Sequence, residues 1–171
     1  MPQFTAGGDF EFLEMPDEET AARRIVALCR EELPREGFSA LEAVQVLSPM
    51  HRTPCGVDNL NRLLQAALNP PAPEKAEFRG SALKLRVGDK VMQTKNDYTK
   101  GVFNGDIGFI REVSADGVKV RYSDELTADY EPNELMMLTL AYAMSVHKSQ
   151  GSEYPVIVLP LVAAHPIMLQ R

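Results

Sequence analysis

Two turn dipeptides, Asn104-Gly105 and Asp116-Gly117, constrain the fold of this chain more than any other feature. Asn-Gly and Asp-Gly supply the positive φ angles that tight β-hairpins require. Short β-type runs lie around them, at residues 89–94, 106–113, 117–122 and 126–130. About 50 residues of short strands joined by hairpins suffice for a small barrel. The sequence therefore predicts a small β-barrel over residues 82–135.

The sequence before this β region follows a different pattern, with longer helices and a buried strand. Pro16 and Asp17 mark the start of a predicted helix that runs to about Leu33, with apolar residues three and four apart. A buried strand is expected over 43–48 and a second amphipathic helix over 57–68. Strands and helices alternating at these lengths are typical of a parallel α/β unit.

Other segments extend this α/β unit. Residues 10–13 alternate like a short strand, residues 142–150 are compatible with a helix, and residues 156–161 are typical of a strand buried in a parallel sheet. The Pro-rich residues 70–81 are interpreted as a connector. The predicted organisation is an α/β domain of residues 1–81 and 136–171, with the barrel of residues 82–135 inserted in it.

The charge of the chain is unevenly distributed. The formal net charge of −6 argues against a general polyanion binder. Residues 84–111 nevertheless hold six basic residues against three Asp; the basic residues are Lys84, Arg86, Lys90, Lys95, Lys100 and Arg111. Charge alone leaves two interpretations open, a surface that faces phosphates and a solvated strand face.

The sequence shows no pattern typical of a membrane span, a signal peptide or a cysteine metal site. No apolar run approaches the roughly 18–20 residues that cross a bilayer, and the N-terminus lacks a basic and apolar signal pattern. We therefore expect a cytoplasmic protein without a membrane partner.

Cys29 and Cys55 have no neighbouring Cys at metal-ligand spacing, so buried free thiols are expected and no metal site is predicted.

Three long stretches together resemble RecD-like DNA helicases of superfamily 1B, in their C-terminal motor half. They are VLSPMHRTPCGVDNLNRLLQAALNP (46–70), LRVGDKVMQTKNDYTKGVFNGDIGFI (85–110) and LTLAYAMSVHKSQGSEYPVIVLPL (138–161). The resemblance covers roughly residues 40–171 and implies a RecA-like parallel sheet domain, of the P-loop NTPase type, with an inserted SH3-like barrel. That architecture agrees with the one read from the turns and periodicity.

The HKSQGSE element, residues 147–153, carries most of the functional implication of this resemblance. In the family it lies where a sheet strand meets both single-stranded DNA and the nucleotide. The resemblance implies DNA contacts for Ser145, His147 and Lys148, and coupling to the nucleotide for Gln150, Gly151 and Glu153. The alternative is a polar helix end that Gly151 caps in the left-handed conformation.

Two further groups of candidates follow from the resemblance. Arg52, after the predicted core strand, is the candidate catalytic residue that approaches the γ-phosphate of ATP, where a guanidinium would stabilise developing charge; an exposed turn arginine is the alternative. In VFNGDIG, Phe103 and Ile107 are expected to pack inward beside the Asn104-Gly105 turn. The nearby barrel candidates for phosphate or base contact are Lys95, Asn96, Tyr98 and Lys100.

The sequence holds no G-x-x-x-x-G-K-[ST] loop that would cradle ATP phosphates and place Mg²⁺. Together with this absence, the resemblance implies a fragment of an ATP-dependent 5′–3′ DNA helicase, of the exodeoxyribonuclease V α-subunit type. It would supply DNA contacts and half of an ATP site, with ATP and Mg²⁺ held only in the intact parent. Expected partners are single-stranded DNA, the first RecA-like domain of the same polypeptide and RecB/RecC-like subunits.

The fragment alone is expected to be inactive and to bind single-stranded DNA weakly at most. The alternative function is a non-enzymatic, SH3-like module that binds nucleic acid or protein. It would explain the hairpins and the missing phosphate loop, but it leaves HKSQGSE without a role.

Overall fold

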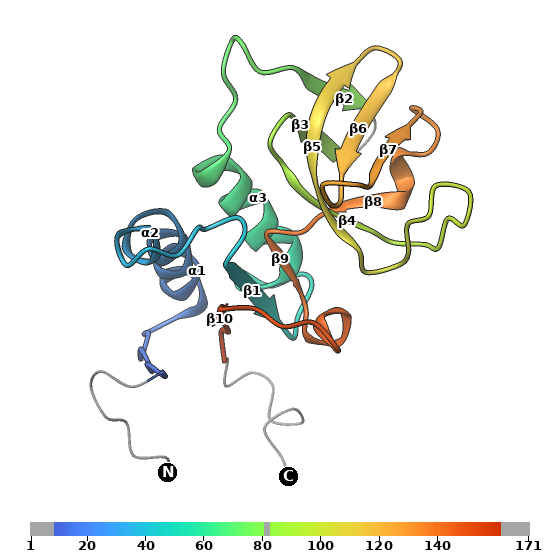
Figure 1. Ribbon diagram of the computed structural model, residues 1–171. Helices are drawn as coiled ribbons and strands as arrows, with labels where there is room; N and C mark the ends of the chain where they lie inside the picture. Colours follow the sequence, from blue (N-terminus) through green and yellow to red (C-terminus); the bar gives the residue numbers. More distant parts are fainter. Residues whose placement is uncertain (1–8, 81–82, 162–171) are drawn as a thin grey trace.

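A computed structural model describes residues 9–80 and 83–161 of the 171-residue chain (Figure 1). Within these residues, no helix is both long enough and apolar enough to cross a membrane. The first helical segment comprises α1 (Glu18–Ala27), the π-helical η1 (Leu28–Glu32) and α2 (Leu33–Arg35). Asp17 caps it, because the Asp17 carboxylate accepts a hydrogen bond of 2.6 Å from the backbone N–H of Thr20. This helix is confirmed, whereas the strand expected over residues 10–13 is wrong, since those residues have no strand pairing.

The small parallel sheet has three strands in the order β10-β1-β9. They are β1 (Val44–Ser48), β9 (Ala143–Ser145) and β10 (Val156–Val158), and β1 pairs with both neighbours in parallel. All of β1 is buried, as its run of apolar residues predicts. The parallel sheet is therefore confirmed, and α3 (Val57–Leu68) is the second predicted helix.

Two expectations near the C-terminal end of the described chain are wrong. Residues 142–150 form β9 and the 3₁₀ turn η3 (Val146–Ser149) instead of an α-helix. The strand expected over 156–161 pairs only as the three residues of β10, where Ile157 is 54% exposed. Because β10 is an edge of the sheet, its β-branched side chains are not covered on both faces.

The antiparallel sheet has five strands in the order β7-β6-β5-β4-β8, and a separate hairpin pairs β2 with β3. The strands are β2 (Glu77–Gly80), β3 (Leu83–Arg86), β4 (Lys90–Gln93), β5 (Ile107–Ser114), β6 (Gly117–Arg121), β7 (Thr127–Tyr130) and β8 (Leu138–Leu140), with the 3₁₀ turn η2 (Leu135–Met137) before β8. The predicted antiparallel strands are confirmed. The closed barrel is not seen, because no ladder joins the outer strands β7 and β8 within the described residues. Residues 77–80, expected to be connector, form β2.

Both turns form with the expected positive φ at glycine, but the Asn104-Gly105 turn does not close a tight hairpin, because residues 94–106 separate β4 from β5. Asp106 N donates to Phe103 O at 3.0 Å, with Gly105 at φ +102° between them. Gly117 has φ +142°, and a Cβ there would lie 2.0 Å from the carbonyl oxygen of Tyr130. Position 117 therefore requires glycine for both its φ angle and its space.

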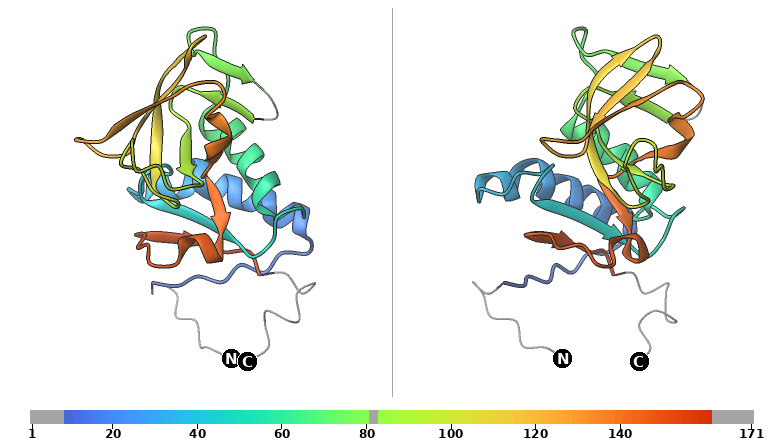
Figure 2. Two further views of the ribbon diagram at one scale, coloured as in Figure 1. Left: turned by 90° about the vertical axis from the view of Figure 1, so that its right-hand side faces the viewer. Right: turned by 45° about the vertical axis from the view of Figure 1, so that its right-hand side comes forward.

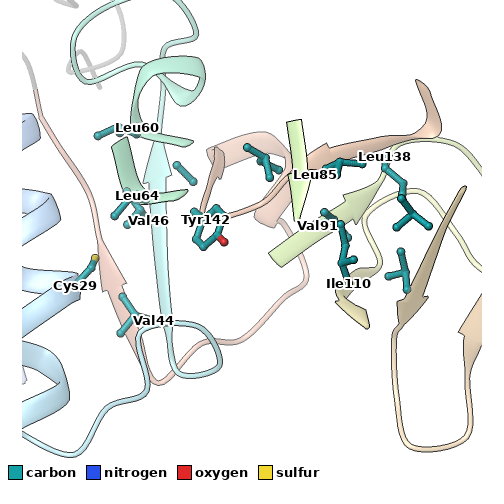
Figure 3. Packing of buried hydrophobic residues seen from close by; sticks show 14 of the residues in the cluster. Cys29, Val44, Val46, Leu60, Leu64, Leu85, Val91, Ile110, Leu138 and Tyr142 are labelled. Atoms are coloured by element: carbon teal, nitrogen blue, oxygen red, sulfur yellow. The ribbon is translucent and has the colours of Figure 1, made fainter. Parts of the chain in front are cut away.

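One hydrophobic core joins the two sheets. The views in Figure 2 place the antiparallel strands on one side of the molecule and the parallel sheet on the other, with α3 beside both. Figure 3 shows Tyr142 between core residues of the α/β part, such as Val46 and Leu64, and those of the antiparallel part, such as Leu85 and Val91. We therefore expect the two parts to unfold together.

A buried carboxylate, that of Asp89, also joins these parts. It is 0% exposed and accepts hydrogen bonds from Gln65 Nε2 at 2.7 Å, Asn69 Nδ2 at 2.6 Å, Tyr142 OH at 2.8 Å and Arg86 N at 2.7 Å. The first two donors lie on α3 or its cap, Tyr142 lies directly before β9, and Arg86 is the last residue of β3. Asp89 therefore holds the antiparallel sheet against α3.

The next residue, Lys90, is only 3% exposed, and its ammonium donates to the Val44 carbonyl at 3.2 Å. Burial lowers the pKa of Lys90 to about 8 from the ordinary 10.5. The unfolded chain therefore binds more protons than the folded protein between about pH 8 and pH 10.5, and in this window the contribution of Lys90 to stability rises with pH.

We expect Lys90→Met to stabilise the fold at neutral pH by about 1–3 kcal/mol, because it removes a buried charge and keeps the volume. The gain should shrink from pH 7 toward pH 9 in urea titrations of both proteins. Lys84→Met is the control, since Lys84 is an exposed lysine on β3. A gain that does not change with pH would contradict the assignment of the effect to the buried charge.

Candidate functional site

The loop between β1 and α3, residues 49–56, is held rigidly by backbone bonds. Val57 N donates to Met50 O at 2.8 Å, and Asp58 N donates to His51 O at 3.1 Å. These N–H groups open α3, so the loop itself satisfies them and leaves them unable to bind an anion. A Cβ at Gly56 would lie 2.5 Å from His51 O, which explains the glycine.

The loop presents Arg52 at its exposed tip. Ser48 fixes its base, since Ser48 Oγ donates to Cys55 O at 2.7 Å. Within the described residues Arg52 has no ion-pair partner. A guanidinium held in this way can meet an anion that approaches the carboxyl end of β1.

The HKSQGSE element continues directly from β9. Ser149 Oγ donates to Val146 O at 2.8 Å, Ser152 N donates to Ser149 O at 3.1 Å, and Gly151 has φ +83°. The element is therefore a tight turn, in which the chain reverses direction at Gly151. All of its residues except Ser149 are exposed, including His147, Lys148, Gln150, Gly151 and Glu153, and Ser145 just before it is half-buried.

The sheet register brings this turn and the Arg52 loop together. Ser48 and Ser145 are partners in the parallel pairing of β1 with β9. Both segments therefore leave the same edge of the sheet, at the carboxyl ends of adjacent strands, where parallel α/β sheets bind ligands. The edge carries the cationic side chains of Arg52 and Lys148, with Gln150 in the turn and Glu153 directly after it.

The barrel candidates lie on another segment, residues 94–106 between β4 and β5. In Figures 1 and 2 this loop and the 146–152 turn lie on the same side of the molecule. Lys95, Asn96 and Tyr98 are exposed. Lys100 is different, because its ammonium lies 2.7 Å from Glu134 Oε1 and 3.7 Å from Asp97 Oδ2. The hydrogen bond with Glu134 raises the pKa of Lys100, so its charge is already paired.

Three further sequence expectations are settled by burial. Phe103, expected to pack inward, is 45% exposed, because it lies on the outer side of the turn. The basic segment is not one surface, since Lys90 is buried and Arg86 is buried in an ion pair with Glu77. Cys29 and Cys55 are free and buried as predicted, and burial raises the pKa of both thiols to about 11.

Comparisons with known proteins identify a family of similar proteins. Residues 60–127 match the family described as the ATP-dependent RecD-like DNA helicase SH3 domain, and residues 140–171 match the UvrD-like helicase C-terminal domain. The ATP-dependent RecD2 DNA helicase of Deinococcus radiodurans is 40% identical over 157 residues, 88% of this chain and 20% of that protein. This chain is a RecD-like helicase segment.

A second sequence relative supports the same family, and a solved structure shares the fold. The RecBCD enzyme subunit RecD of Mycolicibacterium smegmatis is 31% identical over 80% of this segment and 23% of its own length. The structure of a Bacteroides Pif1 helicase in complex with ADP-AlF3 and ssDNA shares the fold, with a TM-score of 0.55 and 20% identity over 82% of this segment and 39% of that chain. The RecD-like segment thus spans about a fifth of the length of these two curated relatives.

Within residues 9–80 and 83–161, the RecD-like segment has exposed cations at this sheet edge but no candidate metal site. No group of three His, Cys, Asp or Glu that could hold a metal ion occurs among the residues that the structure describes. Those residues therefore do not fit Mg²⁺ by themselves, whereas the Arg52 guanidinium fits the charge of a phosphate. Sequence reasoning missed Asp89, whose role depends on donors up to 53 residues away in the chain.

Proposed function

We propose that this segment is the second RecA-like motor domain, with its SH3-like insert, of an ATP-dependent 5′–3′ DNA helicase of the cytoplasm. The observation that carries the proposal is the pairing of Ser48 with Ser145, which brings the Arg52 loop and the HKSQGSE turn to one sheet edge. Arg52, His147 and Lys148 are exposed at this edge, so a second domain could complete the site there.

The proposed roles follow from exposure and charge. Lys148 and His147 are exposed donors for DNA phosphates, with Ser145 beside them, and Lys95 extends the same contact from the 94–106 loop. Arg52 would face the γ-phosphate of an ATP whose Mg²⁺ and remaining phosphates are held by the first RecA-like domain. Gln150 and Gly151 lie in the turn and Glu153 follows it. In this proposal the three residues couple DNA binding to nucleotide binding.

Asn96 and Lys100 have a smaller part in the proposal. Asn96 Oδ1 accepts from Asn104 N at 2.9 Å, and Lys100 is paired with Glu134, so both mainly shape their loop. Similarity to RecBCD subunits supports RecB/RecC-like proteins as partners of the parent enzyme.

A chimera tests the proposal: the Deinococcus radiodurans relative with its matched region replaced by this segment. The unsubstituted chimera should hydrolyse ATP faster when single-stranded DNA is added. Absence of DNA-stimulated hydrolysis in a folded chimera would overturn the helicase assignment and favour a binding module without enzymatic activity.

Lys148→Ala in the chimera is expected to weaken DNA binding and leave thermal stability unchanged, because an exposed lysine contributes little to folding. The slope of log affinity against log salt should fall by about 0.7, the value for one phosphate contact on single strands. Lys119→Ala is the matched control, since Lys119 Nζ lies 3.2 Å from Glu112 Oε2 on the antiparallel sheet. An unchanged salt slope with a lowered melting temperature would show that Lys148 is structural.

A further inference from the structure

Two exposed aromatic rings lie together on the 94–106 loop. Tyr98 is 80% exposed and Phe103 is 45% exposed. Their ring centroids are 5.9 Å apart and their planes meet at 77°, an edge-to-face pair. Much of the apolar surface of both rings is not buried by the chain, so the pair presents aromatic surface to solvent.

The loop that carries the pair is locked by its own hydrogen bonds. Asp97 and Val102 exchange backbone bonds of 2.7 and 3.1 Å, and the Asp97 carboxylate accepts from Thr99 N and Lys100 N at 3.0 Å each. Phe103 N donates to Asp106 Oδ2 at 2.8 Å. The residues directly before the two rings are thus bonded to each other, and Phe103 is bonded in addition to Asp106.

The Glu134 ion pair adds a second anchor. Lys100 Nζ reaches Glu134 across to the segment before η2, and Thr94 N donates to Met137 O at 2.8 Å at the start of the loop. A loop fixed at both of these points loses little conformational entropy when a ligand binds. The aromatic pair is therefore preorganised.

The surroundings of the pair fit a nucleotide, with its flat base and anionic phosphate, better than a protein. Asn96, Thr99, Asn104 and Lys95 are exposed around the two rings. A stable protein interface buries about 800 Å² on each partner, far more than two rings ringed by polar side chains offer. A nucleotide, in contrast, needs one aromatic face for its base and one cation for its phosphate.

We propose that Tyr98 and Phe103 form a stacking site for one unpaired base of single-stranded DNA, with Lys95 on the adjoining phosphate. The inference rests on the proposed function and adds Phe103, the assignment of the base to a preformed aromatic pair, and independence from sequence. Lys100 is assigned to holding the loop in place and not to DNA. The site should prefer a strand with bases over a sugar-phosphate strand, since stacking uses the face that every base has.

The test uses the full 171-residue chain at low ionic strength with two probes, oligothymidylate and an abasic sugar-phosphate strand of equal length. The chain is expected to bind oligothymidylate about 5- to 100-fold more tightly than the abasic strand. Tyr98→Ala and Phe103→Ala should each lose most of this preference and retain binding to the abasic strand. Ile157→Ala is the control, because it truncates an exposed apolar side chain on the other sheet.

A spectroscopic signal separates stacking from general loss of affinity. The chain contains no Trp, so Tyr98→Trp introduces a single reporter whose emission a stacked base quenches. Quenching by oligothymidylate but not by the abasic strand supports the site. Equal affinity for both strands, an unquenched reporter, or a preference that survives both alanine variants would overturn stacking while DNA contact stands. Absence of binding to either strand would overturn the proposed DNA contact itself, and stacking with it.

Discussion

Asp89→Ala is expected to lower the free energy of unfolding by about 3–5 kcal/mol, the range for breaking a buried charged network. The loss arises because four buried donors keep their places and lose their acceptor: Gln65, Asn69, Tyr142 and the backbone N–H of Arg86. Each unsatisfied buried group costs about 1–3 kcal/mol. Urea unfolding followed by circular dichroism measures the change.

Two further variants sharpen this prediction. Asp89→Asn should be less damaging than alanine, because one carboxamide oxygen still accepts while the NH₂ group faces a donor. Asp124→Ala should change stability by less than about 0.5 kcal/mol, because the Asp124 side chain is 96% exposed in its pair with Arg121. A loss below about 1 kcal/mol for Asp89→Ala would mean that the joint between α3 and the antiparallel sheet depends on apolar packing alone.

Arg52→Ala in the chimera is expected to lower kcat for ATP hydrolysis by about 10³-fold at saturating DNA, the lower range for an arginine that contacts a transferred phosphoryl group. The rigid 49–56 loop supports a catalytic effect, because it holds Arg52 by backbone bonds that the substitution does not touch. Steady-state hydrolysis with saturating ATP and DNA measures kcat apart from binding.

The controls for Arg52 separate charge from geometry. Arg52→Lys should recover part of kcat, since lysine keeps the charge and loses the bidentate fork. Arg62→Ala removes an exposed arginine on α3 that bonds to Asn59 at 2.8 Å, and it should leave kcat unchanged. If Arg52→Ala also leaves kcat unchanged, Arg52 is an exposed turn residue and the γ-phosphate assignment fails.

Local patterns predicted the elements that carry their own signals. The Asp17 cap and the three- and four-residue apolar spacing placed the first helix, and the Asn104-Gly105 and Asp116-Gly117 turns placed the antiparallel strands. The candidate residues of the HKSQGSE turn and Arg52 were named from resemblance to a family, and their exposure agrees with access to a ligand. Their roles are still predictions.

The errors have a common cause, because each concerns a residue whose state depends on a distant neighbour. The run 142–150 has no local strand signal strong enough to outweigh its helix-compatible residues, and it becomes β9 only because β1 offers a free edge. Residues 10–13 alternate in the same way as a strand but are not part of a strand in the structure. Phe103 was placed inward from its position beside a turn, but the long 94–106 loop carries it outward.

The sequence by itself determined where helices, strands and reversals occur in most of this chain, because capping, periodicity and positive φ act over a few residues. Only the tertiary structure decided which strands pair, and which cationic side chains are exposed, buried or paired with carboxylates. Lys90, Lys100 and Lys148 are the same kind of residue in the sequence, yet one is buried against a carbonyl, one is paired with carboxylates and one is exposed. Electrostatic environment is set by groups brought together from far along the chain, so it exists only after the fold does.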